Sequence, residues 1–285
     1  MRVGYLGPEG TFSHQALLDA ARGREVEEVA LPTLYDTVMA VQEGLVEAAL
    51  VPIENALEGS VDVTLDTLAT DASGVAIVGE TVAPIRNCLI AARPIALEAI
   101  ETVYSHPQAN AQCAQFLRRR QPGAHVIAVA STADAVRSVS AEPANPHAAL
   151  GNRLAAALYG GTVLLEDVDD QEGNQTRFVW LARAGASEAV RAPLAGGGEP
   201  KTSIVFWGAG DGSAGWLVSC LAELSAREIN LTRIESRPRR IGLGHYMFFA
   251  DLGGEIADPR VAAAVEGLRA RCEEVRVLGS YRLPG

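Results

Sequence analysis

A hydroxyl and a guanidinium stand side by side just before a predicted buried strand. The segment from Asn174 to Ala182 has the sequence NQTRFVWLA, so Thr176 and Arg177 precede an apolar run that starts at Phe178. A positioned hydroxyl can stabilise charge on a departing oxygen, and a guanidinium can hold a carboxylate through two parallel hydrogen bonds. Two simpler explanations compete, namely a polar turn before a strand and a glycosylation acceptor at Asn174.

Three further polar segments follow predicted strands. They are GPEGTFS (7–13), PIENALEGSV (52–61) and SHPQANAQC (105–113). The hydroxyls of the first segment either cap the helix that follows or bind a ligand, and a carboxylate at a strand end must be solvated, paired or functional. Polar strand ends that converge on one cleft indicate a ligand site. The candidates from these segments are Thr11, Ser13, Glu54, Asn55, Ser60, Ser105 and Gln112.

The composition narrows the chemistry that these residues can perform. The net charge of -11 argues against a nucleic-acid partner, which needs a basic face. Every basic residue except Lys201 is arginine, so Schiff-base chemistry and a P-loop lysine are excluded from the first 200 residues. Four scattered cysteines without a CxxC pair, and five histidines away from them, predict no metal site.

The N-terminal sequence runs directly into a predicted strand. It has no charged segment followed by an apolar one, as a secretory signal would, and no stretch approaches the roughly 20 apolar residues of a membrane span. We therefore expect a soluble, cytoplasmic protein, in which the Asn174 pattern has no meaning as a glycan site.

The order of the predicted elements indicates two kinds of domain. In residues 1–184, short apolar runs alternate with helical patterns, which predicts an α/β fold with largely parallel strands, divided near residues 82–90 into two lobes. Residues 185–200 are rich in Gly, Ala and Pro and predict a linker. Residues 201–285 give the order βαββαβ of a ferredoxin-like unit.

One glycine motif matches the spacing of a nucleotide-binding site. Gly210, Gly212 and Gly215 follow a predicted strand with the spacing of a dinucleotide-binding loop, and Glu235 lies at the distance of a ribose-binding acid. The strand at 230–237 leads into another strand, however, and about fifty residues are too few to complete a doubly wound sheet. We expect a tight loop at a helix N-terminus instead of a nucleotide site.

Taken together, these segments resemble the prephenate dehydratase family. The resemblance is carried by the four segments above together with ALGNRLAAALYG (149–160), while INLTRIESRP (229–238) and LGSYR (278–282) resemble the ACT regulatory domain of that family. The resemblance implies a two-lobed, periplasmic-binding-protein-like catalytic domain followed by an ACT domain. It also implies a monofunctional enzyme that converts prephenate to phenylpyruvate with loss of water and carbon dioxide, without metal or redox cofactor.

The resemblance assigns roles to individual residues. Thr176 is the residue on which catalysis depends, and Arg177 either holds a substrate carboxylate or pairs with Glu54, Asp169 or Asp170. Glu54 is the alternative proton donor if burial raises its pKa, so the leading donor stays open. The implied substrate-binding residues are Thr11, Ser13, Asn55, Ser60, Ser105, Gln112, Asn174 and Phe178.

The ACT resemblance implies regulation by phenylalanine bound between subunits of a homodimer or homotetramer. Trp216 places a large ring where the family usually has a small residue, which would fill or reshape the effector pocket. The implied effector residues are Gly215, Trp216, Leu217, Asn230, Leu231, Glu235, Ser236, Arg237 and Pro238.

Two alternative functions fit the same residues. Arogenate dehydratase acts on a substrate with an amine in place of the keto group, and one polar contact can decide between the two substrates. A non-catalytic amino-acid sensor on the same scaffold is a different class, which the hydroxyl at Thr176 disfavours because a sensor needs no donor at a leaving group.

Overall fold

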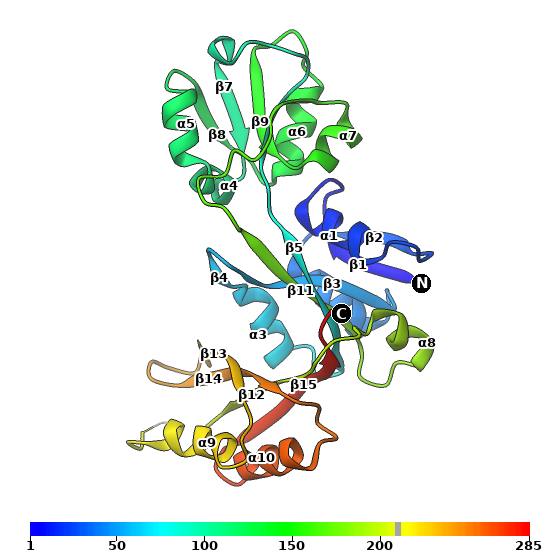
Figure 1. The fold of residues 1–285 in the computed structure, drawn as a ribbon, viewed down its shortest axis with the longest axis vertical. Coiled ribbons are helices and arrows are strands. Elements are labelled where there is room, and N and C mark those ends of the chain that lie inside the picture. Colours follow the sequence, from blue (N-terminus) through cyan, green and yellow to red (C-terminus); the bar gives the residue numbers. More distant parts are fainter. Residues whose placement is uncertain (209–211) are drawn as a thin grey trace.

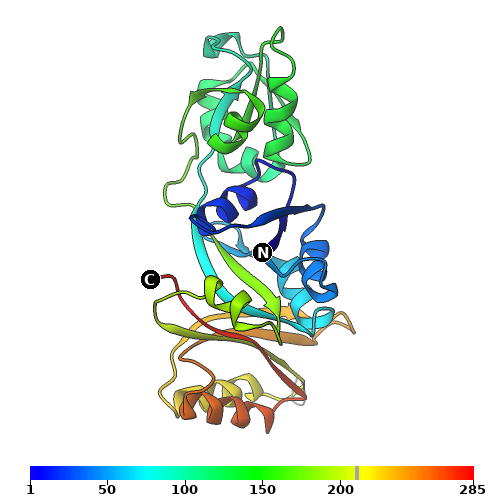
Figure 2. The same ribbon diagram turned by 90° about the vertical axis from the view of Figure 1, so that its right-hand side faces the viewer.

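The computed structural model describes residues 1–208 and 212–285, and it consists of three parts stacked along one axis. A first lobe lies in the middle, a second lobe lies on one side of it, and a C-terminal unit lies on the other (Figure 1). A view turned by 90° shows the same order (Figure 2). The chain passes between the two lobes twice, after β5 and before β11.

The first lobe is a six-stranded sheet with helices on both faces. The sheet order is β2-β1-β3-β11-β5, with β4 paired to β3. Its strands are β1 (Arg2–Leu6), β2 (Glu27–Leu31), β3 (Ala48–Asn55), β4 (Gly59–Ser60), β5 (Val75–Pro84) and β11 (Gln175–Arg183), and its helices are α1 (Phe12–Ala20), α2 (Leu34–Glu43) and α3 (Asp62–Thr70).

The second lobe has a five-stranded sheet of order β10-β6-β9-β7-β8. Its strands are β6 (Cys88–Ala91), β7 (Thr102–Ser105), β8 (His125–Ala128), β9 (His147–Gly151) and β10 (Thr162–Leu165). Its helices are α4 (Pro107–Gln112), α5 (Ala114–Arg120), α6 (Thr132–Ser140) and α7 (Arg153–Tyr159), with a 3₁₀ turn η1 (Leu97–Ala99).

The C-terminal unit is an antiparallel sheet of order β13-β14-β12-β15 with two helices on one face. The elements are β12 (Pro200–Trp207), α9 (Trp216–Ser225), β13 (Leu231–Pro238), β14 (Tyr246–Gly253), α10 (Pro259–Arg269) and β15 (Glu274–Arg282). Between the lobes and this unit lie α8 (Glu188–Arg191) and the 3₁₀ turn η2 (Ala192–Leu194).

Local sequence explains where several helices begin and end. Thr33 caps α2 by accepting a hydrogen bond from the Asp36 amide at 3.0 Å, and Asn152 caps α7 in the same way. Gly44 and Gly160 end these two helices with φ near 74°, a left-handed conformation that glycine adopts without steric cost.

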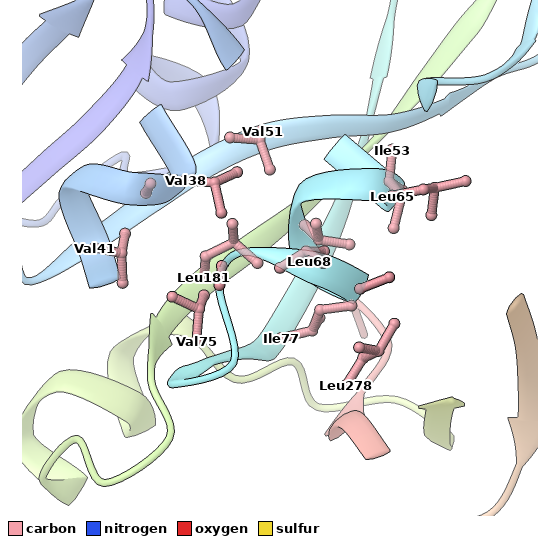
Figure 3. Close-up of a cluster of buried hydrophobic side chains, with 14 of the residues drawn as sticks. Val38, Val41, Val51, Ile53, Leu65, Leu68, Val75, Ile77, Leu181 and Leu278 are labelled. Atoms are coloured by element: carbon pink, nitrogen blue, oxygen red, sulfur yellow. The ribbon is translucent and has the colours of Figure 1, made fainter. Parts of the chain in front are cut away.

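The two faces of the first-lobe sheet are buried against different partners. On one face, Phe178 and Trp180 of β11 pack with Tyr5 and Leu17, under α1. On the other face, Val179, Leu181 and their neighbours pack with α2, α3 and the open face of the C-terminal sheet, including Leu278 (Figure 3). Successive strand residues point to opposite faces, so β11 separates these two cores.

The fold class predicted from the sequence is confirmed, with two lobes and a βαββαβ unit in the expected order. The expectation of largely parallel strands is wrong in detail, because β11 runs antiparallel to both β3 and β5, and β6 runs antiparallel to β9 and β10. A strand that returns from the other lobe enters the sheet from the opposite end, which the local pattern of residues does not reveal.

The segment predicted as a bare linker contains α8 and η2, and Leu194 is buried against the first lobe. Gly210 of the glycine motif lies outside the described residues, whereas Gly215 caps α9 with a φ of 81°. Within residues 1–208 and 212–285, we find no helix with the length and apolarity needed to cross a membrane.

Candidate functional site

Asn55 organises the polar end of strands β3 and β11. Its Oδ1 atom accepts hydrogen bonds from the amides of Leu57 and Glu58, both at 3.0 Å, which fixes the orientation of the side-chain amide. The Nδ2 atom then donates to Oδ1 of Asn174 and Oγ1 of Thr176, each at 2.9 Å, with a longer contact of 3.2 Å to the Gln175 carbonyl. Register places Thr176 directly opposite Asn55 across the two strands.

This arrangement leaves two side chains with a proton that they can donate. Because the Thr176 oxygen accepts from Asn55, its hydroxyl proton is available to another group. Because Oδ1 of Asn174 also accepts from Asn55, its Nδ2 group remains as a donor. That Nδ2 atom is buried and has no acceptor among the residues that the structure describes, so Thr176 and Asn174 form a neighbouring pair of possible donors.

The second lobe presents more unpartnered polar atoms at the edge of its sheet. Ser105 ends β7 and Asn152 follows β9, and these two parallel strands end at the same edge. Asn87 precedes β6, which is antiparallel to β9, so Asn87 lies at that edge too. Within the described ranges, Ser105 Oγ, Asn152 Nδ2 and Asn87 Oδ1 are buried without hydrogen-bond partners. Buried polar atoms are seldom left unpaired, so these three atoms are candidates for contacts to a ligand.

Two side-chain hydrogen bonds join the lobes. The Tyr159 hydroxyl donates to the carbonyl of Glu9 at 2.8 Å, and Nε2 of Gln112 lies 3.4 Å from Oε1 of Glu58. Near the crossover segments, a pocket of about 360 Å³ is lined by Asn174 among other residues. Its lining residues are Pro84, Ile85, Arg86, Asp167, Asp169, Gln171, Glu172, Gly173, Asn174 and Gln175.

The other predicted residues of the first lobe have structural roles. Thr11 is the N-cap of α1, since its oxygen accepts from the His14 amide at 3.2 Å while its hydroxyl donates to the Leu6 carbonyl at 2.9 Å. Ser13 is buried in the same helix, and Phe178 is fully buried in the apolar core. The helix-cap alternative therefore holds for Thr11.

Glu54, Ser60 and Arg177 face away from Thr176. Arg177 lies 3.4 Å from Glu54, and Arg233 of the C-terminal unit bonds Ser60 at 2.6 Å and lies 3.5 Å from the Glu54 carboxylate. The expectation that these residues join Thr176 in one site is not met, because neighbouring residues of a strand point to opposite faces. Glu54 is also part-exposed instead of buried, so the condition for its role as proton donor is absent.

The two acids that were alternative partners of Arg177 bond elsewhere. Asp169 accepts from the amide and the side chain of Asn87 at 2.7 and 2.6 Å. Burial raises the pKa of Asp169, although these hydrogen bonds act to lower it. Asp170 accepts from the amides of Gln115 and Phe116 at the start of α5. In the described residues, no group of three or more His, Cys, Asp or Glu side chains is arranged to hold a metal ion.

The predicted effector residues occupy three places in one chain. Gly215, Trp216 and Leu217 begin α9 and line a pocket of about 210 Å³ with Tyr246 and Phe248. The Trp216 ring packs on Phe206 and Phe248, and its Nε1 atom donates to the Arg271 carbonyl at 2.9 Å. The ring is thus fixed against the core of the unit.

The remaining effector candidates lie apart from that pocket or only beside it. Asn230 and Leu231 line a different hollow near the end of α9. Ser236 and Pro238 pair with Phe248 and Tyr246, next to the Trp216 pocket. Arg237 turns to the first lobe and makes ion pairs with Asp62 and Asp66, at 2.5 and 3.0 Å, and Glu235 is half-buried on the same strand.

Sequence reasoning missed several buried polar residues. Asn87 and Asn152 were not among the candidates, although Asn152 stands at a predicted helix start. Glu80, Asp251 and Tyr281 cluster with Arg177 between the first lobe and the C-terminal unit. A carboxylate inside an apolar strand, as at Glu80, is a signal that could have revealed this cluster.

Comparisons with known proteins agree with this architecture. Residues 3–186 match the family model described as prephenate dehydratase. The prephenate dehydratase of Mycolicibacterium vanbaalenii is 40% identical over 293 residues, covering 98% of this chain and 90% of that protein. The enzyme of Bacillus subtilis is 37% identical, with 99% of both chains covered.

A solved structure supports the same relationship. Prephenate dehydratase from Arthrobacter aurescens, solved in complex with L-Phe, has 34% sequence identity and a TM-score of 0.87. The match covers 99% of this chain and 90% of that one. On the combined evidence of sequence and fold, the chain belongs to the prephenate dehydratase family of lyases.

Proposed function

We propose that this chain binds prephenate between its lobes and converts it to phenylpyruvate, water and carbon dioxide, with Thr176 as the donor to the departing oxygen. The observation that carries the proposal is the donor pair held by Asn55, in which Thr176 and Asn174 each accept from the same amide at 2.9 Å. Each keeps a proton for the ligand. Donors aimed at a site where negative charge develops lower the barrier most when they are already in place.

The reaction requires few other groups from the protein. As the ring carboxylate leaves as carbon dioxide, the electron pair of the breaking carbon–carbon bond enters the ring and expels the ring oxygen, which takes up a proton and departs as water. Thr176 stabilises the charge on that oxygen. Glu54 has no part in this proposal, because its carboxylate lies on the face of β3 that meets Arg177 and Arg233.

The remaining unpartnered atoms of the second lobe supply contacts to the substrate. Ser105 Oγ and Asn152 Nδ2 are buried donors without acceptors in the described residues, and the substrate carries two carboxylates. Burying a donor without an acceptor costs about 1–3 kcal/mol, which a bound carboxylate would recover. We assign Asn174, Ser105 and Asn152 to substrate binding in this proposal.

The decisive experiment follows phenylpyruvate formation from prephenate by purified wild-type chain, Thr176→Ala and Thr176→Ser. We expect turnover by the wild type, severe loss in the alanine variant and partial retention in the serine variant, which keeps the hydroxyl. A folded wild-type chain without turnover would refute the assignment. Equal rates for wild type and Thr176→Ala would remove Thr176 from the mechanism. Arogenate at equal concentration, in competition with prephenate, measures which substrate is preferred.

We also propose regulation by L-phenylalanine bound where C-terminal units of two subunits meet. The related Arthrobacter aurescens enzyme was solved with L-Phe bound, and the effector candidates of this chain are spread over α9, the α9–β13 turn and β13. A second subunit in a homodimer or homotetramer would bring such separated residues together. Light scattering and initial rates with and without saturating L-Phe test this, and no change in either quantity would contradict it.

A further inference from the structure

Arg177 lies at the centre of a buried group of side chains between the first lobe and the C-terminal unit. We call this group the interdomain cluster, and it comprises Arg177, Glu80, Lys201, Ser203, Asp251 and Tyr281. The guanidinium donates from Nε to Glu80 at 2.8 Å, from one terminal nitrogen to Asp251 at 2.6 Å, and from the other to the Tyr281 hydroxyl at 2.9 Å. With the weaker contact to Glu54 at 3.4 Å, four of its five N–H donors are used.

The cluster is closed by contacts among its other members. Lys201, the only lysine of the chain, places its Nζ atom 3.0 and 3.1 Å from the two carboxylate oxygens of Glu80. Ser203 donates to Asp251 at 2.6 Å and lies 3.0 Å from the Tyr281 hydroxyl, which is 3.1 Å from Glu80. Three strands of the C-terminal sheet, β12, β14 and β15, thus bind two strands of the first lobe, β5 and β11.

The charges of the cluster balance and are shielded from water. The side chains of Arg177 and Lys201 are 11% and 12% exposed, and those of Glu80 and Asp251 are 5% exposed. Burial lowers the pKa of Arg177, but Asp251, Tyr281 and Glu80 outweigh it and raise that pKa above its ordinary value. Removing one member of such a group leaves an uncompensated buried charge, which costs much more than an exposed ion pair.

The cluster binds β11 through Arg177, which directly follows Thr176, the proposed donor to the substrate. Thr176 pairs with Asn55 and Arg177 pairs with Glu54 across β3, and the register shifts directly after Arg177. The irregular pairing loosens the ladder on the β3 side only, since the pairing of β11 with β5 stays regular from Gln175 to Trp180. The side chain of Arg177, anchored from the opposite face, therefore helps to set the backbone position from which Thr176 points.

We propose that Arg177 is a positioning residue, through which Asp251 and Tyr281 of the C-terminal unit hold Thr176 in place for catalysis. This inference rests on the proposed dehydratase function. It makes the C-terminal unit a support for turnover even without effector, although Asp251 and Tyr281 lie on the opposite side of the sheet from the substrate. A substrate carboxylate could bind Arg177 only by displacing Asp251 from its buried hydrogen bond with the guanidinium.

The test compares Tyr281→Phe and Asp251→Asn with Arg276→Met as a matched control. Arg276 also crosses from the C-terminal unit to the first lobe, but its side chain donates there to the carbonyls of Leu68 and Ala69 on α3 and not to the cluster. The measurements are kcat and KM for prephenate and the midpoint of thermal unfolding, with rates taken well below that midpoint. Tyr281→Phe keeps the ring and decides the outcome if Asp251→Asn fails to fold.

We expect kcat to fall about 10-fold in Tyr281→Phe and more in Asp251→Asn, with KM within about twofold of wild type, because a small misplacement of a catalytic group costs rate and not binding. Arg276→Met should lower the unfolding midpoint with kcat within about twofold of wild type.

Two results would overturn the proposal. An unchanged kcat in both cluster variants shows that Thr176 does not depend on the cluster. A raised KM with an unchanged kcat shows instead that the cluster serves substrate binding. An inactive wild-type chain is a separate outcome, since it refutes the dehydratase function itself and the positioning role with it.

Discussion

Thr176 and Arg177 are neighbours in sequence, yet the two faces of β11 treat their side chains in opposite ways. On the Thr176 face, the side-chain amide of Asn55 donates to both Asn174 and Thr176, and the buried Nδ2 of Asn174 has no partner among the described residues. On the Arg177 face, the guanidinium makes four hydrogen bonds to protein groups. One face is short of partners and the other is rich in them.

This difference suggests separate roles for the two faces, with substrate binding on the Thr176 face and stabilisation of the fold on the Arg177 face. An unpartnered buried donor is unfavourable in the free protein, and on the Thr176 face we propose that the substrate supplies the missing acceptor. A guanidinium with four of its five N–H donors in use has little left to offer a ligand, and its removal destabilises the folded protein. Substitutions on the two faces should therefore separate activity from stability.

The largest effect is expected for Arg177→Met. The variant leaves Glu80 and Asp251 buried with Lys201 as the remaining cation of the cluster, so the free energy of unfolding should fall by about 3–5 kcal/mol. Urea denaturation measures this, with Arg137→Met as the control, because the ion pair of Arg137 with Asp134 is largely exposed. The control should change by less than about 1 kcal/mol. Equal losses of unfolding free energy in the two variants would show that the cluster stabilises the protein no more than an exposed ion pair does.

Thr176→Ala should have the next largest effect, and it should lower kcat instead of the free energy of unfolding. We expect kcat to fall by about 100-fold or more, as when one donor to a developing oxyanion is removed. The free energy of unfolding should change by less than about 1 kcal/mol, since only the hydrogen bond from Asn55 is lost. A stability loss as large as that of Arg177→Met, measured in the same urea series, would contradict the division between the two faces.

Ser105→Ala sharpens the comparison with a smaller effect. The Ser105 hydroxyl is fully buried and has no partner in the described chain. Its removal should leave the unfolding free energy unchanged or raise it by up to about 1 kcal/mol, while kcat/KM for prephenate falls about 5- to 10-fold. Ser140→Ala is the matched control, because Ser140 also has a buried, unpartnered hydroxyl but lies at the end of α6. A similar loss of kcat/KM in that control would remove the significance of Ser105.

The smallest expected effect is on the stability of the protein at alkaline pH, through Tyr281 on the Arg177 face. Burial raises the pKa of Tyr281 above its ordinary value near 10. The folded state thus favours the neutral hydroxyl, and this contribution to stability is complete below about pH 10 and is lost as pH rises further. Tyr281→Phe should therefore lose stability less steeply than wild type above about pH 10. Tyr35→Phe, at an exposed position, should keep the wild-type slope, and a flattened slope there would contradict the assignment.

Much of the fold followed from local pattern. The strand at residues 2–6 and the βαββαβ order of the C-terminal unit were predicted and observed. The antiparallel direction of β11 was not, because direction in a sheet depends on where the chain re-enters after the second lobe. The helix α8 was missed in a segment of small residues, where burial of Leu194 against the first lobe gives order that local propensity lacks.

The sequence by itself determined that polar groups stand at the ends of apolar strands. It led us to expect Thr176 and Arg177 in one site, whereas the two side chains lie on opposite faces of β11. Only the tertiary structure decided which partners each side meets. Asn55 meets Thr176, while Asp251 and Tyr281 reach Arg177 from positions more than seventy residues away in the sequence. The physical reason is that side-chain alternation is a local property of the backbone, whereas charge pairing and burial depend on how distant segments pack.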